Sequence, residues 1–142
     1  MAQFPRIGRQ VSRLAGFRFF EGLSPAALRS AEAMVTELRL PAGRSLCEEG
    51  ALGHEAFFII EGAAVVIRDG RGVATLGPGD VVGEGALLGN GHRSATVRTT
   101  EPMIALVMNV REFLSLLELP GVGEEIRRVA AARTPKYGAS AA

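Results

Sequence analysis

The most constraining feature of this 142-residue sequence is a rhythm of short apolar runs between residues 41 and 108. These runs of apolar and β-branched residues are separated by Gly, Asp and Pro at intervals of about ten residues, which is typical of a β-sandwich or small barrel. We predict strands at 45–47, 56–60, 63–68, 73–76, 81–82, 95–99 and 103–108. Glu61-Gly62 and Asp69-Gly70 are tight-turn pairs in which Gly supplies the positive φ that a hairpin requires.

Helices are predicted ahead of these strands. Residues 4–22 carry apolar side chains at a helical spacing that Gly16 interrupts, which predicts a short helix and a turn; these side chains are Ile7, Val11, Leu14, Phe17 and Phe20. Ser24 is a candidate N-cap, and Pro25 suits the first helical position. A second helix is therefore expected, ending before Pro41.

Helices are also predicted after the strands. Asn109 with Glu112 three residues on forms a capping box, which predicts a helix to about Leu117. Pro120-Gly121 breaks this helix, and a further short amphipathic helix follows up to about residue 133. We divide the chain, as one domain over 1–142, into four parts: N-terminal helices 1–40, a β unit 41–108, C-terminal helices 109–133 and a tail 134–142.

Composition excludes several classes of function. The chain is long enough for one domain with a proper core but has no room for a second catalytic domain. Its net charge is +1 with charges interspersed, so nucleic acid is not expected as a direct partner. It contains no apolar run of about 20 residues and no signal-peptide core, so we expect no membrane span and a cytoplasmic location.

Cys47 is the only cysteine, so the chain cannot form an internal disulfide. A reactive thiol needs an electropositive site, whereas Glu48 and Glu49 follow Cys47 directly. We therefore expect Cys47 to be a small core or near-surface strand residue.

The stretch "GEGALLGNGHRSATV", residues 83–97, has the chemistry of an anion site. A short helix over 83–88 would present free backbone N–H groups, and small residues would leave them uncovered. Arg93 could fold back and bind two phosphate oxygens, with the Ser94 hydroxyl beside it. Glu84 cannot bind phosphate but can accept from a sugar hydroxyl, which points to a cyclic nucleotide. A surface ion pair between Glu84 and Arg93 is the alternative that these residues leave open.

Residues from about 17 to 132 resemble the cyclic-nucleotide-binding domain family of the catabolite activator protein, protein kinase A and G regulatory segments and nucleotide-gated channels. Three segments carry the resemblance: "FFEGLSPAALRSAEAMVTELRLPAG" is similar to the helical lead-in, "EEGALGHEAFFIIEGAAVVI" to the central hairpin, and "LGPGDVVGEGALLGNGHRSATV" to the phosphate-binding cassette. The resemblance implies a mainly β fold with flanking helices (α+β), a double-stranded β-helix or jelly-roll-like β-roll. The cassette is residues 83–97.

The resemblance also implies a role for each cassette residue. Glu84 would accept from the ribose 2′-hydroxyl, and Arg93 would pair with the equatorial phosphate oxygen. The backbone amides of the helix turn would approach the phosphate from one side, at Gly83, Gly85 and Ala86. Ser94 and Ala95 would complete the phosphate site from the other side. The purine would be covered from the C-terminal helices, with Arg127, Val129, Arg133 and Tyr137 as candidates.

Three residues depart from the family pattern. Gly85 stands where a Leu, Ile or Met usually packs under the sugar, and Gly inside a helix costs about 0.5–1 kcal/mol relative to Ala. His92 replaces a common Pro and loosens the loop before Arg93, and His54 replaces a usual Asp before the hairpin. Ser94 after the Arg is found in both cGMP and bacterial cAMP binders, and we expect cAMP in preference to cGMP.

The function expected is a non-enzymatic regulatory domain that binds a cyclic nucleotide, without a cofactor or metal, and relays occupancy through the C-terminal helices. Its effector domain or partner is not encoded in these residues, and a homodimer stays open. One alternative is a protein-interaction module that keeps the fold without the ligand, which Gly85 favours. Another is a cupin-type metal enzyme, which the two isolated histidines, His54 and His92, disfavour.

Overall fold

The computed structural model describes residues 13–17, 20–87, 91–119, 121 and 123–124. Its helices are η1 (Arg13–Gly16), α1 (Pro25–Glu32), α2 (Glu84–Leu87) and α3 (Val110–Leu117). Its strands are β1 (Thr36–Leu40), β2 (Ser45–Cys47), β3 (Glu55–Glu61), β4 (Ala64–Arg68), β5 (Arg71–Leu76), β6 (Val81–Val82), β7 (Thr96–Thr99) and β8 (Met103–Asn109).

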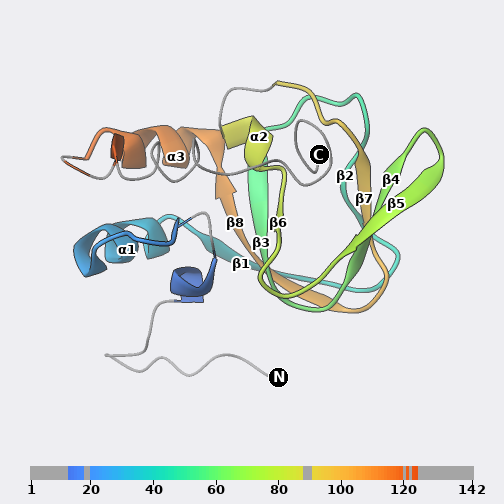
Figure 1. The fold of residues 1–142 in the computed structure, drawn as a ribbon, viewed down its shortest axis with the longest axis horizontal. Helices are drawn as coiled ribbons and strands as arrows, with labels where there is room; N and C mark the ends of the chain where they lie inside the picture. Colours follow the sequence, from blue (N-terminus) through green and yellow to red (C-terminus); the bar gives the residue numbers. More distant parts are fainter. Residues whose placement is uncertain (1–12, 18–19, 88–90, 120, 122, 125–142) are drawn as a thin grey trace.

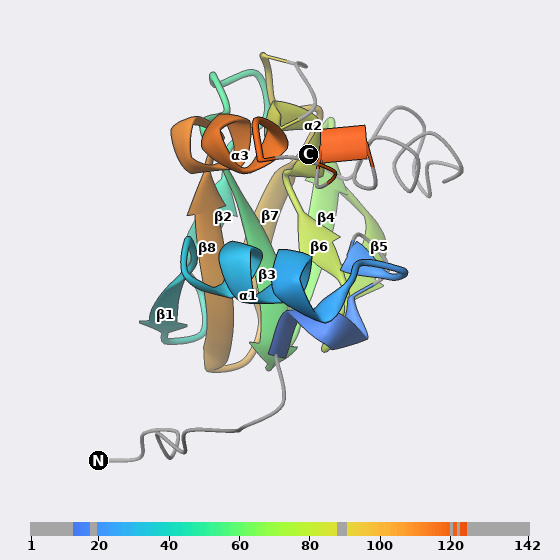
Figure 2. The same cartoon turned by 90° about the vertical axis from the view of Figure 1, so that its left-hand side faces the viewer.

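The strands form two four-stranded antiparallel sheets, in the orders β1-β8-β3-β6 and β2-β7-β4-β5. Figures 1 and 2 show the two sheets packed as a roll, with α1 and α3 on the outer face of the β8–β3 sheet. The predicted mainly β fold with flanking helices is confirmed. Each of the seven predicted strands is present within one or two residues of its predicted bounds.

Two hydrophobic cores lie on opposite faces of β3. Side chains alternate along a strand, so Phe57 and Ile59 face the second sheet while Ala56 and Phe58 face the helices. Phe58 is fully buried. Because both faces of β3 are covered, its residues 56–60 are continuously apolar rather than alternating.

One predicted helix is shorter than expected. α1 begins after the N-cap Ser24, whose side chain accepts from the Ala27 N–H, but it ends at Glu32. Residues 36–40 form β1, which pairs antiparallel with β8, so the prediction of helix up to Pro41 was wrong there. Alternation explains the strand: Leu38 and Leu40 pack on the core between the sheets, and Glu37 and Arg39 alternate with them.

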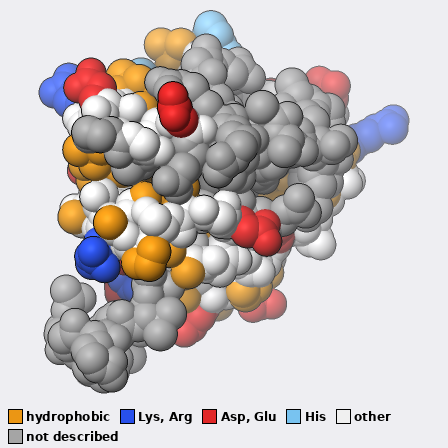
Figure 3. Space-filling view, turned by 60° about the vertical axis from the view of Figure 1, so that its left-hand side comes forward, with side chains coloured by type: hydrophobic (Ala, Val, Ile, Leu, Met, Phe, Trp, Pro, Cys, Tyr) orange, Lys and Arg blue, Asp and Glu red, His pale blue; other side chains and the backbone are white. Residues whose placement is uncertain are grey.

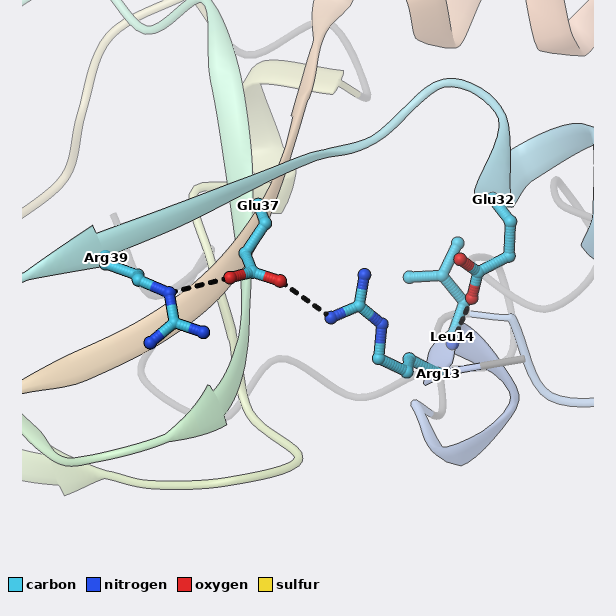
Figure 4. A network of polar contacts seen from close by, with 5 residues as sticks. All are labelled: Arg13, Leu14, Glu32, Glu37 and Arg39. Carbon is cyan, nitrogen blue, oxygen red and sulfur yellow. Dashed lines mark hydrogen bonds and ion pairs between the residues drawn. The ribbon is translucent and has the colours of Figure 1, made fainter. Parts of the chain in front are cut away.

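The N-terminal helical segment is joined to the roll by a small polar network (Figure 4). The Glu37 carboxylate on β1 accepts from Arg13 of η1 at 3.2 Å and from Arg39 at 2.8 Å. Partial burial raises the pKa of Glu37, but the hydrogen bonds from the two arginines outweigh this, so its pKa lies below the usual value. Glu32 of α1 accepts from the Leu14 backbone N–H at 2.9 Å. Of residues 4–22, where a short helix and a turn were predicted, the structure describes 13–17 and 20–22, and η1 is the helix named among them.

Local signals placed the turns and α3 correctly. Gly62 has φ 98°, and Asp69 and Gly70 have φ 53° and 78°, as the hairpin turns require. The Asn109 side chain accepts from the Glu112 N–H at 2.8 Å, and Glu112 accepts from the Asn109 N–H at 3.2 Å, which completes the predicted capping box. The helix predicted after Gly121 lies, apart from residues 123 and 124, outside the described residues.

Charges of both signs are scattered among hydrophobic side chains over the described part of the face drawn in Figure 3. No helix among the described residues is long and apolar enough to cross a membrane.

Candidate functional site

The crossing between β6 and β7 carries the predicted cassette and begins with a turn that requires glycine. Gly83 has φ 80° and leads directly into the single turn of α2, which packs against β3 and α3. A Cβ on Gly83 would collide with Nη1 of Arg93 and lie 2.8 Å from the Glu55 carbonyl oxygen. The backbone conformation and the close approach of the Glu55 carbonyl therefore both disfavour a larger residue, and such a residue would also displace the Arg93 guanidinium.

Arg93 is the central side chain of this region. It is 6% exposed, which is rare for an arginine because burying a charge is costly without compensating contacts. Its backbone N–H donates to the Ala51 carbonyl at 2.8 Å, and its carbonyl accepts from the Gly50 N–H at 2.9 Å. The guanidinium is in contact with Gly83, just before α2, so a fixed positive charge lies at the start of that helix.

The residues after Arg93 are held in place from the second sheet. The Ser94 carbonyl accepts from Nε of Arg68 at 3.1 Å, and Arg68 is the last residue of β4. Ala95 is fully buried, and its carbonyl lies 3.8 Å from Sγ of Cys47. Arg68 was not predicted as a site residue, because its contact joins positions distant in the sequence.

Cys47 is buried beneath the cassette. Desolvation raises the pKa of its thiol from the ordinary value of 9.0 to about 11, although the charge of Arg93 and a backbone hydrogen bond from Val97 act in the opposite direction. The thiol is therefore protonated at neutral pH, in agreement with the interpretation of Cys47 as a core residue rather than a redox residue.

The structure brings Arg93 back to the start of the predicted cassette. Gly83 contacts Arg93 directly, and Glu84, which is half-buried, follows Gly83 as the first residue of α2. Gly85 is buried within α2. The Ala86 side chain and the candidate purine lids lie outside what the structure describes; these lids are Arg127, Val129, Arg133 and Tyr137.

A cavity of about 490 Å³, whose described lining includes none of residues 83–97, opens beside β1 and β2, which are edge strands of the two sheets within the described part of the chain. Its apolar lining includes Leu38 and Phe57, and its charged lining residues are Glu37, Glu55 and Glu112. Among the described residues that line it there is no Lys or Arg. Carboxylates repel a phosphate, so this cavity suits an anionic ligand less well than the surroundings of Arg93.

The described residues contain no group of three or more His, Cys, Asp or Glu side chains that could hold a metal ion. His54 and His92, which the cupin alternative would need as ligands, are both exposed. The loops that carry His54 and His92 contact each other through their backbones, because His92 forms an isolated β-bridge with Leu52.

Comparison with known proteins identifies the family. The profile of the cyclic nucleotide-binding domain matches residues 37–119, which include all of the two sheets except the first residue of β1, together with the cassette and α3. The chain belongs to the cyclic nucleotide-binding domain family.

Individual relatives carry this domain in larger proteins. The chain is 34% identical over 129 residues to acetyltransferase Pat of Mycolicibacterium smegmatis, which covers 87% of the chain and 38% of that protein. It is 29% identical over 126 residues to the cyclic AMP receptor protein of Thermus thermophilus, which covers 84% of the chain and 58% of the receptor. The chain thus spans less than two thirds of either relative.

A solved structure matches almost end to end. The N-terminal domain of a transcriptional regulator from Streptomyces coelicolor A3(2) superposes with a TM-score of 0.76 at 26% identity. The match covers 86% of this chain and 89% of that domain.

Proposed function

We propose that this chain binds a cyclic nucleotide at the cassette, residues 83–97, and acts as a non-enzymatic regulatory domain. The observation that carries the proposal is the buried guanidinium of Arg93, held against Gly83 at the start of α2. A guanidinium can bind two phosphate oxygens at once, and a charge already desolvated by the protein interacts strongly with a bound anion.

The remaining contacts follow from the order of residues in the cassette. Glu84, as the first residue of α2, accepts from the ribose 2′-hydroxyl in this proposal. Backbone amides of Gly83, Gly85 and Ala86 approach the phosphate from one side, and Ser94 and Ala95 complete the cradle from the other.

The nucleotide that we propose is cAMP in preference to cGMP. Two considerations support this choice: Ser94 is compatible with bacterial cAMP binders, and a relative that is 29% identical is a cyclic AMP receptor protein. The preference depends on the base, which Arg93 and Glu84 do not contact in this arrangement.

The output is proposed to pass through α3 and the residues that follow it. The Val110 N–H, at the first position of α3, donates to the His54 carbonyl at 2.8 Å. Three other residues of the same loop contact the side chain or the backbone of Arg93, namely Gly50, Ala51 and Gly53. Occupancy of the cassette can thus influence the start of α3 through one short loop. The coupling free energy is limited to the difference in ligand affinity between the two arrangements of the helices.

The effector is proposed to be a partner protein or further domains of a longer chain. The relatives named above include an acetyltransferase and a receptor, so the same domain accompanies different outputs. The proposal places this chain in the cytoplasm, without a direct contact to nucleic acid, and leaves a homodimer open.

A second candidate function is a protein-interaction module that keeps the fold but binds no nucleotide. Gly85 favours it, because α2 has no side chain at the position where relatives of the family place an apolar residue under the sugar. The two candidates differ in a single measurable property, the affinity for cyclic nucleotide.

Calorimetric titration of the chain with cAMP, cGMP and non-cyclic AMP tests the proposal. We expect saturable binding of cAMP, weaker binding of cGMP and little binding of AMP. Arg93→Ala should lose about 2–5 kcal/mol of cAMP binding free energy, because a buried phosphate would lack its charged partner.

Arg98→Ala is the matched control, since Arg98 is an exposed arginine on β7 and should leave binding unchanged. If the parent chain binds none of the nucleotides while its thermal unfolding shows a folded domain, the interaction module replaces the binding proposal. If Arg93→Ala binds cAMP as the parent does, the ligand lies elsewhere.

A further inference from the structure

Gly53, in the loop before β3, lies directly against the side chain of Arg93. A Cβ on Gly53 would be 2.9 Å from both Cζ and Nε of Arg93 and 3.0 Å from its Cδ. Non-bonded carbon atoms are at their optimal separation at about 3.5–4.0 Å. Even a methyl group at position 53 therefore requires either the guanidinium or the backbone to move.

The backbone on both sides of this contact is held by hydrogen bonds. The Gly53 N–H donates to the Gly91 carbonyl at 2.8 Å. The Arg93 N–H donates to Ala51 at 2.8 Å, and the Arg93 carbonyl accepts from Gly50 at 2.9 Å. Since these bonds fix the two backbone segments relative to each other, the part that can yield is the end of the Arg93 side chain.

Gly83, in another segment of the chain, also limits where the Arg93 guanidinium can lie. Its missing Cβ leaves the space that Nη1 of Arg93 occupies, and the Glu55 carbonyl also approaches Gly83 closely. Two glycines from separate loops therefore leave the room in which the buried guanidinium lies. Gly83 needs to be glycine for its φ of 80° as well, whereas Gly53 does not have a positive φ. Among the described residues, the contact that accounts for glycine at 53 is the one with the Arg93 side chain.

We propose that Gly53 is a positioning residue for anion binding: the absence of a side chain there sets where the Arg93 guanidinium lies beside the start of α2. This inference rests on the proposed function of Arg93 as the phosphate partner. Gly53→Ala should keep the charge in the protein but shift it, so cAMP affinity should fall less than in Arg93→Ala. We expect a loss of about tenfold.

The experiment compares Gly53→Ala with Gly72→Ala. Gly72 is exposed on β5, has no positive φ, and an added Cβ would meet only Cγ2 of Val65 at an ordinary 3.4 Å. Both variants are titrated with cAMP, and the Arg93 Nε–H resonance, assigned by its loss in Arg93→Ala, is followed by NMR in the ligand-free proteins. Gly53→Ala should weaken binding and move this resonance, whereas Gly72→Ala should do neither.

A double variant separates positioning from general damage to the loop. If the added methyl group acts by displacing the guanidinium, then it should have no further effect on thermal stability once Arg93→Ala has removed that group. The midpoint of Gly53→Ala/Arg93→Ala should then equal that of Arg93→Ala alone. This holds even if Gly53→Ala by itself folds poorly, because removal of the guanidinium should restore folding.

The outcomes distinguish this inference from the proposed function. Absence of cAMP binding by the parent overturns the proposed function, and this inference with it. Binding by the parent that Gly53→Ala leaves unchanged overturns the inference alone. A double variant less stable than Arg93→Ala also overturns it, because the methyl group would then disturb the loop without acting through Arg93.

Discussion

Glu84 and Arg93 are proposed to bind different parts of the nucleotide, the ribose and the phosphate. A substitution at Glu84 tests the ribose contact alone. Glu84→Gln keeps the shape and one acceptor oxygen, but a hydrogen bond to a neutral acceptor is weaker than one to a carboxylate by about 1 kcal/mol. We expect cAMP affinity to fall by that amount and the discrimination against 2′-deoxy-cAMP to shrink. Titration of both nucleotides measures this, with Glu61→Gln, exposed at the end of β3, as the control. Equal discrimination in parent and variant would remove Glu84 from the ribose site.

The raised pKa of Cys47 predicts how stability depends on pH. Burial makes the folded protein hold the thiol proton up to about pH 11, whereas the unfolded chain loses it near the ordinary pKa of 9.0. The folded state therefore binds more protons between these values, and the free energy of unfolding should fall as pH rises through this window, by about 2–3 kcal/mol in total. Below pH 9 the contribution should be complete. Chemical denaturation of the parent and Cys47→Ser between pH 7 and 11 tests this, since the serine variant should lack this part of the slope.

At the scale of elements, the start of α3 depends on one residue. Asn109→Ala removes the acceptor for the Glu112 N–H, and loss of such a cap costs about 1 kcal/mol. We expect a lower thermal midpoint and faster amide exchange in the first turn of α3. Arg111→Ala, at an exposed position of the same helix, should leave both unchanged. Equal exchange in the two variants would show that packing of Phe113 and Leu116, rather than the cap, holds the helix.

Elements with a strong local signal were predictable from the sequence, and β1 was not. The hairpin turns have Gly where φ is positive, and α3 has its capping box, so neighbouring residues sufficed for both. Residues 36–40 come soon after α1 and contain Leu and Glu, which favour helices. Five alternating residues are too short a pattern to override that preference, so the strand is defined mainly by its pairing with β8. The site divides in the same way: Glu84 and Arg93 stand out in the sequence, whereas Gly53 and Arg68 matter through contacts with distant residues.

At the scale of the whole molecule, we expect the two cores to unfold as one cooperative unit, because β3 contributes side chains to both. Phe58 packs on Phe17 and Phe20 on the helical side, with ring centroids 5.4 and 5.3 Å apart, while its neighbour Phe57 faces the second sheet. Either Phe58→Ala or Phe57→Ala should lower stability by about 3–5 kcal/mol and leave a single unfolding transition.

Denaturation followed by far-UV circular dichroism measures both variants. Leu114→Ala is the comparison, because Leu114 is 52% exposed on α3 and should cost little. Two separate transitions in either phenylalanine variant would show that the helices and the roll unfold independently.

The place of Cys47 gives the molecule an internal reporter of its own motions. The chain has no other thiol, and this one belongs to the last residue of β2 and lies 3.8 Å from the carbonyl of Ala95 in the cassette. Because the Cys47 thiol is buried, an alkylating reagent reaches it mainly when that part of the roll opens. The rate of labelling therefore measures how often the roll opens there. A ligand held by the cassette should slow the reaction in proportion to its occupancy. Labelling timed with and without cAMP would therefore report binding in the unmodified chain, and an unchanged rate at saturating cAMP would mean that the roll opens there without releasing the nucleotide.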